Sequence, residues 1–280
     1  MKGLEILARS LSVATGGAGK KYKFGRRWQY HPQSDRHSKI ACWGVIFDLL
    51  RHSEGLQRAV TSDRVGFGIN LTMRDFRNNR DKDLDLVIAR RIGAKPKRRS
   101  FKSLVKHWGI VLAPDEEQML AALPDIGQID KTSVIMALEA KACMTEFSKA
   151  RPRLYDELNS SHNTVHGDTS EAIAAGFVLI NTAESFISPK RNNFPIGLMA
   201  EDVTTHNQPR DAMLAFGKVK ELPRRSNSSD SGFDAMAVGF VSCRNDGSQV
   251  VVAKDYVKSQ TDFRYDEFIR RLAVLVEPKL

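Results

Sequence analysis

The sequence predicts an α/β protein with one central mixed β-sheet flanked by helices. Short apolar runs typical of buried strands alternate with longer segments whose apolar residues recur at helical spacing. The strand candidates are residues 80–90, 133–142 and 175–181, and the helix candidates are residues 40–60, 144–160, 209–222 and 265–276. A hairpin is expected at residues 235–243 and 249–254, because Asn245-Asp246-Gly247 supplies residues that tolerate the positive φ of a tight turn.

The chain divides into a basic N-terminal arm or cap at residues 1–38 and a single α/β domain at residues 39–280. The domain carries a basic insertion at about residues 91–131, with short helices predicted within it. Gly66-Phe67-Gly68 is expected to form a turn, since a lone pair of glycines lacks the rest of a nucleotide-binding motif. No Pro-rich linker separates further domains.

Composition is that of a soluble globular protein. Hydrophobic residues make up 41% of the 280 positions and charged residues 27%. The longest apolar runs are too short for a membrane span, and no signal-peptide core is visible. Three scattered cysteines fit a reducing compartment, so a cytoplasmic location without membrane contact is expected.

The net charge of +10 is concentrated in two stretches. Residues 6–34 contain six Lys or Arg and no acid, and residues 86–114 contain eight and again no acid. Such clustering is typical of proteins that bind a nucleic-acid backbone. The predicted DNA contacts are Lys20, Lys21, Lys23, Arg26, Arg27, Lys95, Lys97, Arg98, Arg99 and Lys102.

One strand candidate carries an acid and a base at its far end. In Ser133–Ala142, Glu139 and Lys141 are two residues apart and therefore point to the same face of a sheet. Charged groups at the end of an apolar strand are costly unless they hold each other, a metal or a phosphate. This pair is therefore the first candidate for catalysis; the alternative is a strand-end ion pair.

An acidic residue on the strand before it completes the candidate site. Asp85 lies in residues 80–90, and with Glu139 it offers two carboxylates that suit Mg²⁺, an ion that prefers oxygen ligands and keeps several waters. Asp83, Asp125 and Asp130 stay open as alternatives for this first metal ligand. A metal here would polarise a phosphoryl oxygen and lower the pKa of its bound water.

These residues resemble the PD-(D/E)XK nucleases, which include restriction endonucleases. The similarity covers roughly residues 81–182: Asp85-Leu-Val-Ile, then Val134-Ile-Met-Ala-Leu-Glu139-Ala-Lys141, a helix, and the strand Phe177–Ile180. The resemblance implies a restriction-endonuclease-like core in which Asp85 and Glu139 bind Mg²⁺ and Lys141 assists the attacking water. It also makes Glu146 and Glu157, on the following helix, candidates for an extra carboxylate.

The function expected on these grounds is a Mg²⁺-dependent endodeoxyribonuclease of the type II restriction class that acts on double-stranded DNA as a homodimer. One alternative is a nonspecific repair, recombination or phage nuclease. Another is a DNA-binding protein without catalysis, in which Glu139 and Lys141 merely pair.

Overall fold

A six-stranded mixed sheet forms the centre of the computed structural model, which describes residues 1–15, 24–91, 99–130, 133–227, 229–257 and 261–280. The strands are β1 (Val65–Asp75), β2 (Arg80–Arg90), β3 (Ser133–Cys143), β4 (Ile173–Asn181), β7 (Ala235–Ser242) and β8 (Val251–Val252), in that spatial order. β3, β4 and β7 are parallel, whereas the β1–β2, β2–β3 and β7–β8 pairs are antiparallel. The predicted α/β class is confirmed.

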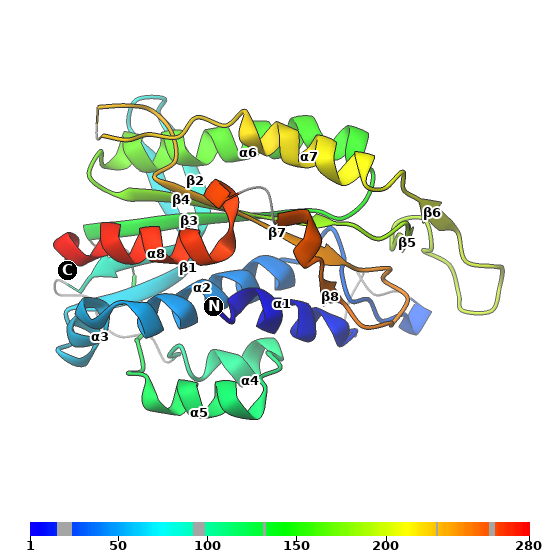
Figure 1. Ribbon diagram of the computed structural model, residues 1–280, viewed down its shortest axis with the longest axis horizontal. Coiled ribbons are helices and arrows are strands. Elements are labelled where there is room, and N and C mark those ends of the chain that lie inside the picture. Colours follow the sequence, from blue (N-terminus) through cyan, green and yellow to red (C-terminus); the bar gives the residue numbers. More distant parts are fainter. Residues whose placement is uncertain (16–23, 92–98, 131–132, 228, 258–260) are drawn as a thin grey trace.

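Helices cover both faces of the sheet (Figure 1). One face packs on α6 (Phe147–Asp168) and α7 (Arg210–Lys220), and the other on α1 (Gly3–Ser12), α2 (Arg36–His52) and α8 (Tyr265–Val276). Because β3 and β4 are covered on both faces, residues 134–138 of β3 and 173–180 of β4 are continuously apolar rather than alternating.

The remaining elements lie around this sandwich. They are α3 (Glu54–Thr61), α4 (Leu104–Trp108), α5 (Pro114–Ala122), the two-stranded sheet β5 (Ser185–Ile187) and β6 (Val203–Thr205), and the 3₁₀ turns Lys254–Val257, Thr261–Phe263 and Glu277–Lys279. α4 and α5 form an outer layer against α2, where Phe101 stacks on Trp43 at 4.7 Å between ring centroids. The described part of the predicted insertion thus contributes apolar side chains, such as Phe101, Leu104 and Leu120, to the hydrophobic core.

The predicted N-terminal arm or cap at residues 1–38 begins with a helix. Residues 3–12 form α1, whose Ile6, Leu7 and Leu11 are buried against α2. The buried carboxylate of Asp48 caps this helix by accepting hydrogen bonds from the backbone N–H groups of Lys2 and Gly3. Tertiary packing and this distant cap stabilise a helix that is too short to be stable alone.

Two further expectations are corrected. Gly66-Phe67-Gly68 lies within β1 rather than in a turn. Alternation along β2 predicts Leu84, Leu86 and Ile88 on one face, but Leu84 packs on the α6 side whereas Leu86 and Ile88 face the α2 side. The strand changes face between them, at Asp85, opposite the point where Asn70 of β1 has a φ of 51°. In the described part of the chain, no helix has the length and apolar character needed to cross a membrane.

Candidate active site between strands β2 and β3

Strand β3 places Glu139 and Lys141 side by side, as the alternation of side chains predicts. The Lys141 Nζ atom lies 2.8 Å from Glu139 Oε1. Glu139 is only 3% exposed, although it sits in an apolar strand between β2 and β4. The pair is therefore a largely buried ion pair and not one exposed at a strand end.

Strand β2 brings Asp85 to the same region. The antiparallel register pairs Leu86 with Leu138, so Asp85 lies level with Glu139 on the neighbouring strand. The Asp85 Oδ2 atom accepts a hydrogen bond of 2.8 Å from the backbone N–H of Ala140. Asp85 and Glu139 are 54 positions apart in the sequence, and the chain between the two strands includes α4 and α5 before it returns to the adjacent strand.

Burial makes both carboxylates hard to ionise. It raises the pKa of Glu139 to about 7, and the negative charge of Asp85 adds to this rise while Lys141 and Lys82 oppose it. Burial likewise raises the pKa of Asp85. The backbone N–H of Ala140, the Lys141 ammonium and the Ser38 hydroxyl lower this pKa but do not cancel the effect of burial. Two acids that share a low-dielectric site and disfavour each other's charge gain from a cation placed between them.

Helix α6 adds a third carboxylate beside the lysine. Glu157 Oε2 lies 3.1 Å from Lys141 Nζ, so the ammonium bridges Glu139 and Glu157. Burial disfavours the charged form of Lys141, but the Glu139 carboxylate outweighs it and raises the pKa of the lysine. Lys82 Nζ donates a 2.7 Å hydrogen bond to the Glu157 backbone carbonyl and lies 3.8 Å from Glu139 Oε1.

A cleft of about 540 Å³ opens beside these residues. Asp85, Lys141 and Glu157 line it, together with the first residues of α2 and the exposed cations Lys149, Arg153 and Lys190. The N-terminus of α2 adds the positive end of a helix dipole, which favours anions. His37 is neutral there, because burial and then Lys141 lower its pKa to about 4.

The donor set fits a hard divalent cation. Asp85 and Glu139 supply carboxylate oxygens, and Glu139 Oε2 is buried without a hydrogen-bond partner among the described residues. Within that same part of the chain, no group of three or more His, Cys, Asp or Glu side chains could hold a metal ion. Two carboxylates with waters suit Mg²⁺ better than ions that need a full set of protein ligands.

The alternative aspartates lie elsewhere. Asp83 is exposed and accepts a 2.6 Å hydrogen bond from the Thr72 hydroxyl. Asp125 is exposed and accepts one of 2.9 Å from the backbone N–H of Lys102. Asp130 is also exposed and precedes the start of β3, which is about 20 Å along the strand from Glu139. Asp85 is therefore the aspartate that the fold brings to Glu139.

The predicted DNA-binding residues are scattered. Lys20, Lys21, Lys23, Lys95, Lys97 and Arg98 lie outside the described residues. Arg27 and Arg99 are exposed, whereas Arg26 is 8% exposed and pairs with Glu201 at 2.9 Å. Lys102 donates to the Ala121 carbonyl at the end of α5. Arg26 and Lys102 therefore already have partners within the protein. Such pairing stabilises charged groups near a packed surface.

Sequence reasoning missed Lys82, His37 and Ser38 as neighbours of the site. Lys82 lies three positions before Asp85 on the same strand, and this closeness in sequence is what could have indicated that it belongs to the site. His37 and Ser38 belong to the start of α2, which no motif connects with β3. Of the two glutamates considered on the following helix, Glu157 contacts Lys141, whereas Glu146 lines the cleft and lies 3.7 Å from Lys149.

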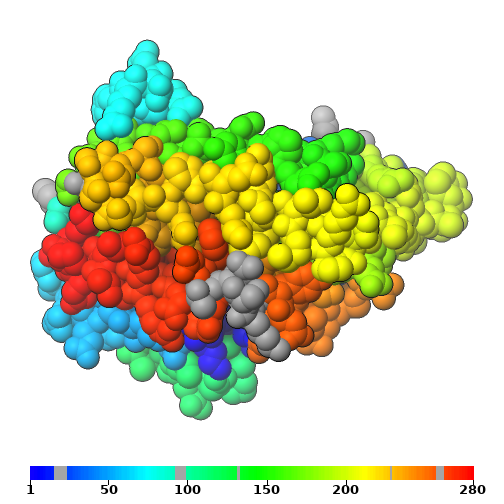
Figure 2. Space-filling view, turned by 45° about the horizontal axis from the view of Figure 1, so that its top comes forward, coloured from blue at the N-terminus to red at the C-terminus, as the bar shows by residue number. Residues whose placement is uncertain are grey.

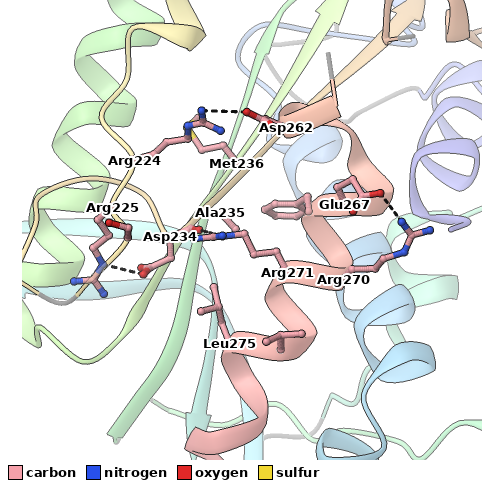
Figure 3. Close-up of a pocket in the computed structure, with 13 residues that line it drawn as sticks. Arg224, Arg225, Asp234, Ala235, Met236, Asp262, Glu267, Arg270, Arg271 and Leu275 are labelled. Carbon is pink, nitrogen blue, oxygen red and sulfur yellow. Dashed lines mark hydrogen bonds and ion pairs between the residues drawn. The ribbon is translucent and has the colours of Figure 1, made fainter. Parts of the chain in front are cut away.

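A second cavity, of about 800 Å³, lies between the start of β7 and α8 (Figure 3). Ion pairs partly neutralise its charged walls: Arg225 pairs with Asp234 at 2.8 Å, and Arg224 lies 3.6 Å from Asp262. Arg271 donates to the Asp234 backbone carbonyl. None of the sequence-predicted site residues lines this cavity, so the candidate site is the cleft at Asp85 and Lys141.

Comparison with known proteins returns no matching family model, and neither a curated protein nor a solved structure matches the chain.

Proposed function

We propose that the protein is a Mg²⁺-dependent DNA endonuclease of the PD-(D/E)XK type. One observation carries the proposal: Asp85 and Glu139 lie level on paired strands, and Lys141 is bonded to Glu139 at the wall of a cleft. A structural ion pair alone does not need a second, half-buried acid whose charge disfavours that of the first. That acid costs stability, as groups kept for function often do.

Each side chain has a distinct task in this proposal. Asp85 and Glu139 would hold Mg²⁺, which when bound polarises a phosphoryl oxygen and lowers the pKa of its water. Lys141 orients the attacking water and offsets negative charge on the phosphate. Glu157 also contacts the Lys141 ammonium, at 3.1 Å, and helps to keep it beside Glu139. The N-terminus of α2 and Lys190 favour the entry of an anion into the cleft.

The substrate class follows from the charge. A net charge of +10 and a cleft with exposed lysine and arginine suit a phosphodiester backbone. We propose double-stranded DNA as the substrate, a type II restriction activity, and a homodimer whose two-fold symmetry would match cleavage of both strands. A cytoplasmic location belongs to the same proposal.

The test combines cleavage and metal binding. Supercoiled plasmid is incubated with the wild type, Glu139→Gln, Lys141→Ala and the matched control Glu117→Gln, in Mg²⁺ or in EDTA. Glu117 is exposed on α5 and does not line the cleft. We expect Mg²⁺-dependent cleavage by the wild type and control, and a loss of roughly 100-fold or more in the other two. Calorimetry with Mg²⁺ should give binding that Glu139→Gln weakens.

The products separate the alternatives. Discrete fragments support a restriction enzyme, whereas a smear supports a nonspecific nuclease. A third outcome would favour a non-catalytic DNA-binding protein. In that case the wild type binds DNA but cuts no substrate, and Glu139→Gln binds Mg²⁺ as well as the wild type does.

A further inference from the structure

The β1–β2 hairpin extends beyond the sheet. Strand β2 pairs with β3 only from Leu86 to Arg90, but its pairing with β1 continues to Asp75 and Arg80. The hairpin packs on α6 through the buried Met73 and Leu84, and its tip projects from the body of the molecule (Figure 2). A two-stranded ribbon that protrudes in this way needs an additional device to keep its turn in one conformation.

The fully buried carboxylate of Asp75 is that device. It accepts hydrogen bonds from the backbone N–H groups of Arg77 at 3.1 Å and Asn78 at 3.0 Å. It also accepts from the Asn78 side chain at 2.9 Å and from Arg80 Nε at 3.1 Å. The end of α6 docks closely on it, since a Cβ added to Gly167 would lie 2.4 Å from Asp75 Oδ1.

This rigid turn presents an aromatic side chain to solvent. Phe76 is 70% exposed, and its backbone N–H donates to the Gly167 carbonyl at 3.3 Å. Its neighbour Arg77 is exposed and forms no ion pair with the described residues. An exposed aromatic ring beside a cation that has no ion pair among the described residues contributes little to the core, and the hydrogen-bonded turn that carries it loses little backbone entropy on binding.

The charge of the hairpin indicates the ligand. Residues 74–82 contain four Arg or Lys and two Asp. Both acids already form ion pairs within the hairpin: Asp75 pairs with Arg80, and Asp81 pairs with Arg74. A polyanion with flat rings matches this surface better than a protein patch does. We propose that Phe76 inserts between two base pairs and stacks on a DNA base, and that Arg77 binds the adjoining backbone phosphate, an inference that rests on the proposed function.

Helix α6 relates this contact to the cleft. Glu157 contacts Lys141, and Gly167 contacts Phe76, ten positions further along the same helix. Ten residues of helix span about 15 Å, which corresponds to four or five base steps of about 3.4 Å. For DNA that runs parallel to α6, the stacked base is therefore expected about that many steps from the phosphate at Lys141.

Duplex DNA with 2-aminopurine at successive positions is titrated in EDTA with the wild type, Phe76→Ala, Phe76→Trp and Arg77→Ala. The matched control is Val274→Ala, which is 73% exposed on α8. We expect Phe76→Ala to weaken DNA binding roughly 5- to 100-fold. It should also abolish the change in 2-aminopurine fluorescence that the wild type causes on binding. Arg77→Ala should weaken binding and lower its salt dependence, whereas Phe76→Trp and Val274→Ala bind as the wild type does.

The outcomes distinguish this contact from the nuclease. Equal DNA affinity of Phe76→Ala and the wild type overturns the contact, even if the wild type cuts plasmid. A change in oligomeric mass without a change in DNA affinity also overturns it, in favour of a protein interface. A wild type whose DNA binding depends on Phe76 but that never cuts supports the contact and contradicts the nuclease.

Discussion

The Asp85 carboxylate accepts a hydrogen bond of 2.8 Å from the backbone N–H of Ala140, the residue between Glu139 and Lys141. This bond joins β2 to β3 at the point where the two strands carry the buried Glu139 and the half-buried Asp85 and Lys141. It uses one oxygen of Asp85 and fixes the carboxylate next to its neighbour. The position of the proposed metal ligand is therefore tied to the backbone of the strand that supplies the other two residues.

Asp85→Asn and Asp83→Asn form a matched pair that tests which aspartate belongs to the site. The amide oxygen of Asn can still accept from Ala140, so Asp85→Asn should fold, but it removes the charge that a cation requires. We expect plasmid cleavage to fall roughly 100-fold or more in Asp85→Asn and to stay near wild type in Asp83→Asn. Full activity of Asp85→Asn would exclude Asp85 as a metal ligand.

Glu157→Gln tests whether α6 positions Lys141. The amide still accepts a hydrogen bond from the ammonium but no longer favours its charge. We expect turnover to fall by about tenfold, less than in Lys141→Ala, with KM for DNA nearly unchanged. The control is Glu221→Gln, whose side chain is exposed at the end of α7. A KM effect without a turnover effect would assign Glu157 to DNA binding.

The stability of the metal-free protein should depend on pH through Glu139. Its pKa rises from 4.5 to about 7 on folding, so between these values the folded chain holds a proton that the unfolded chain has released. The stabilisation is fully present below pH 4.5 and is lost as the pH rises to about 7. The loss is on the order of 3 kcal/mol.

Urea denaturation in EDTA between about pH 5 and 8 measures this dependence. The free energy of unfolding of the wild type should fall relative to that of Glu139→Gln, which carries a neutral amide at every pH. Parallel profiles for the two proteins would show that Glu139 ionises normally in the folded state.

Asn181 joins the ends of the three parallel strands and should be essential for stability. It is fully buried, and its Nδ2 donates to the carbonyls of Met144 at 2.9 Å and Cys243 at 2.8 Å. Its Oδ1 accepts from the backbone N–H groups of Ala183 and Cys243. Asn181→Ala leaves these groups unpaired and should cost about 3 kcal/mol in chemical denaturation. Asn193→Ala, at an exposed position, should cost little.

Several elements could be predicted from the sequence because their signals are local. The α8 bounds agree with the predicted Tyr265–Val276 helix, and the apolar runs gave β3 and β4. The helix α1 was missed, although Leu7 and Leu11 are one turn apart, because its cap is Asp48, more than forty positions away. Strand β1 was missed because its glycines resemble a turn, and only pairing with β2 makes residues 66–68 extended.

The sequence by itself determined that Glu139 and Lys141 share a face, since alternation along a strand depends only on local backbone geometry. It also determined the α/β class, through the periods of its apolar residues. Tertiary structure decided which acids meet this pair. The register of β2 on β3 brings Asp85 to Glu139 and leaves Asp83, Asp125 and Asp130 elsewhere. The packing of α6 brings Glu157 to Lys141. Register and helix packing are set by contacts between distant segments, and no local pattern encodes them.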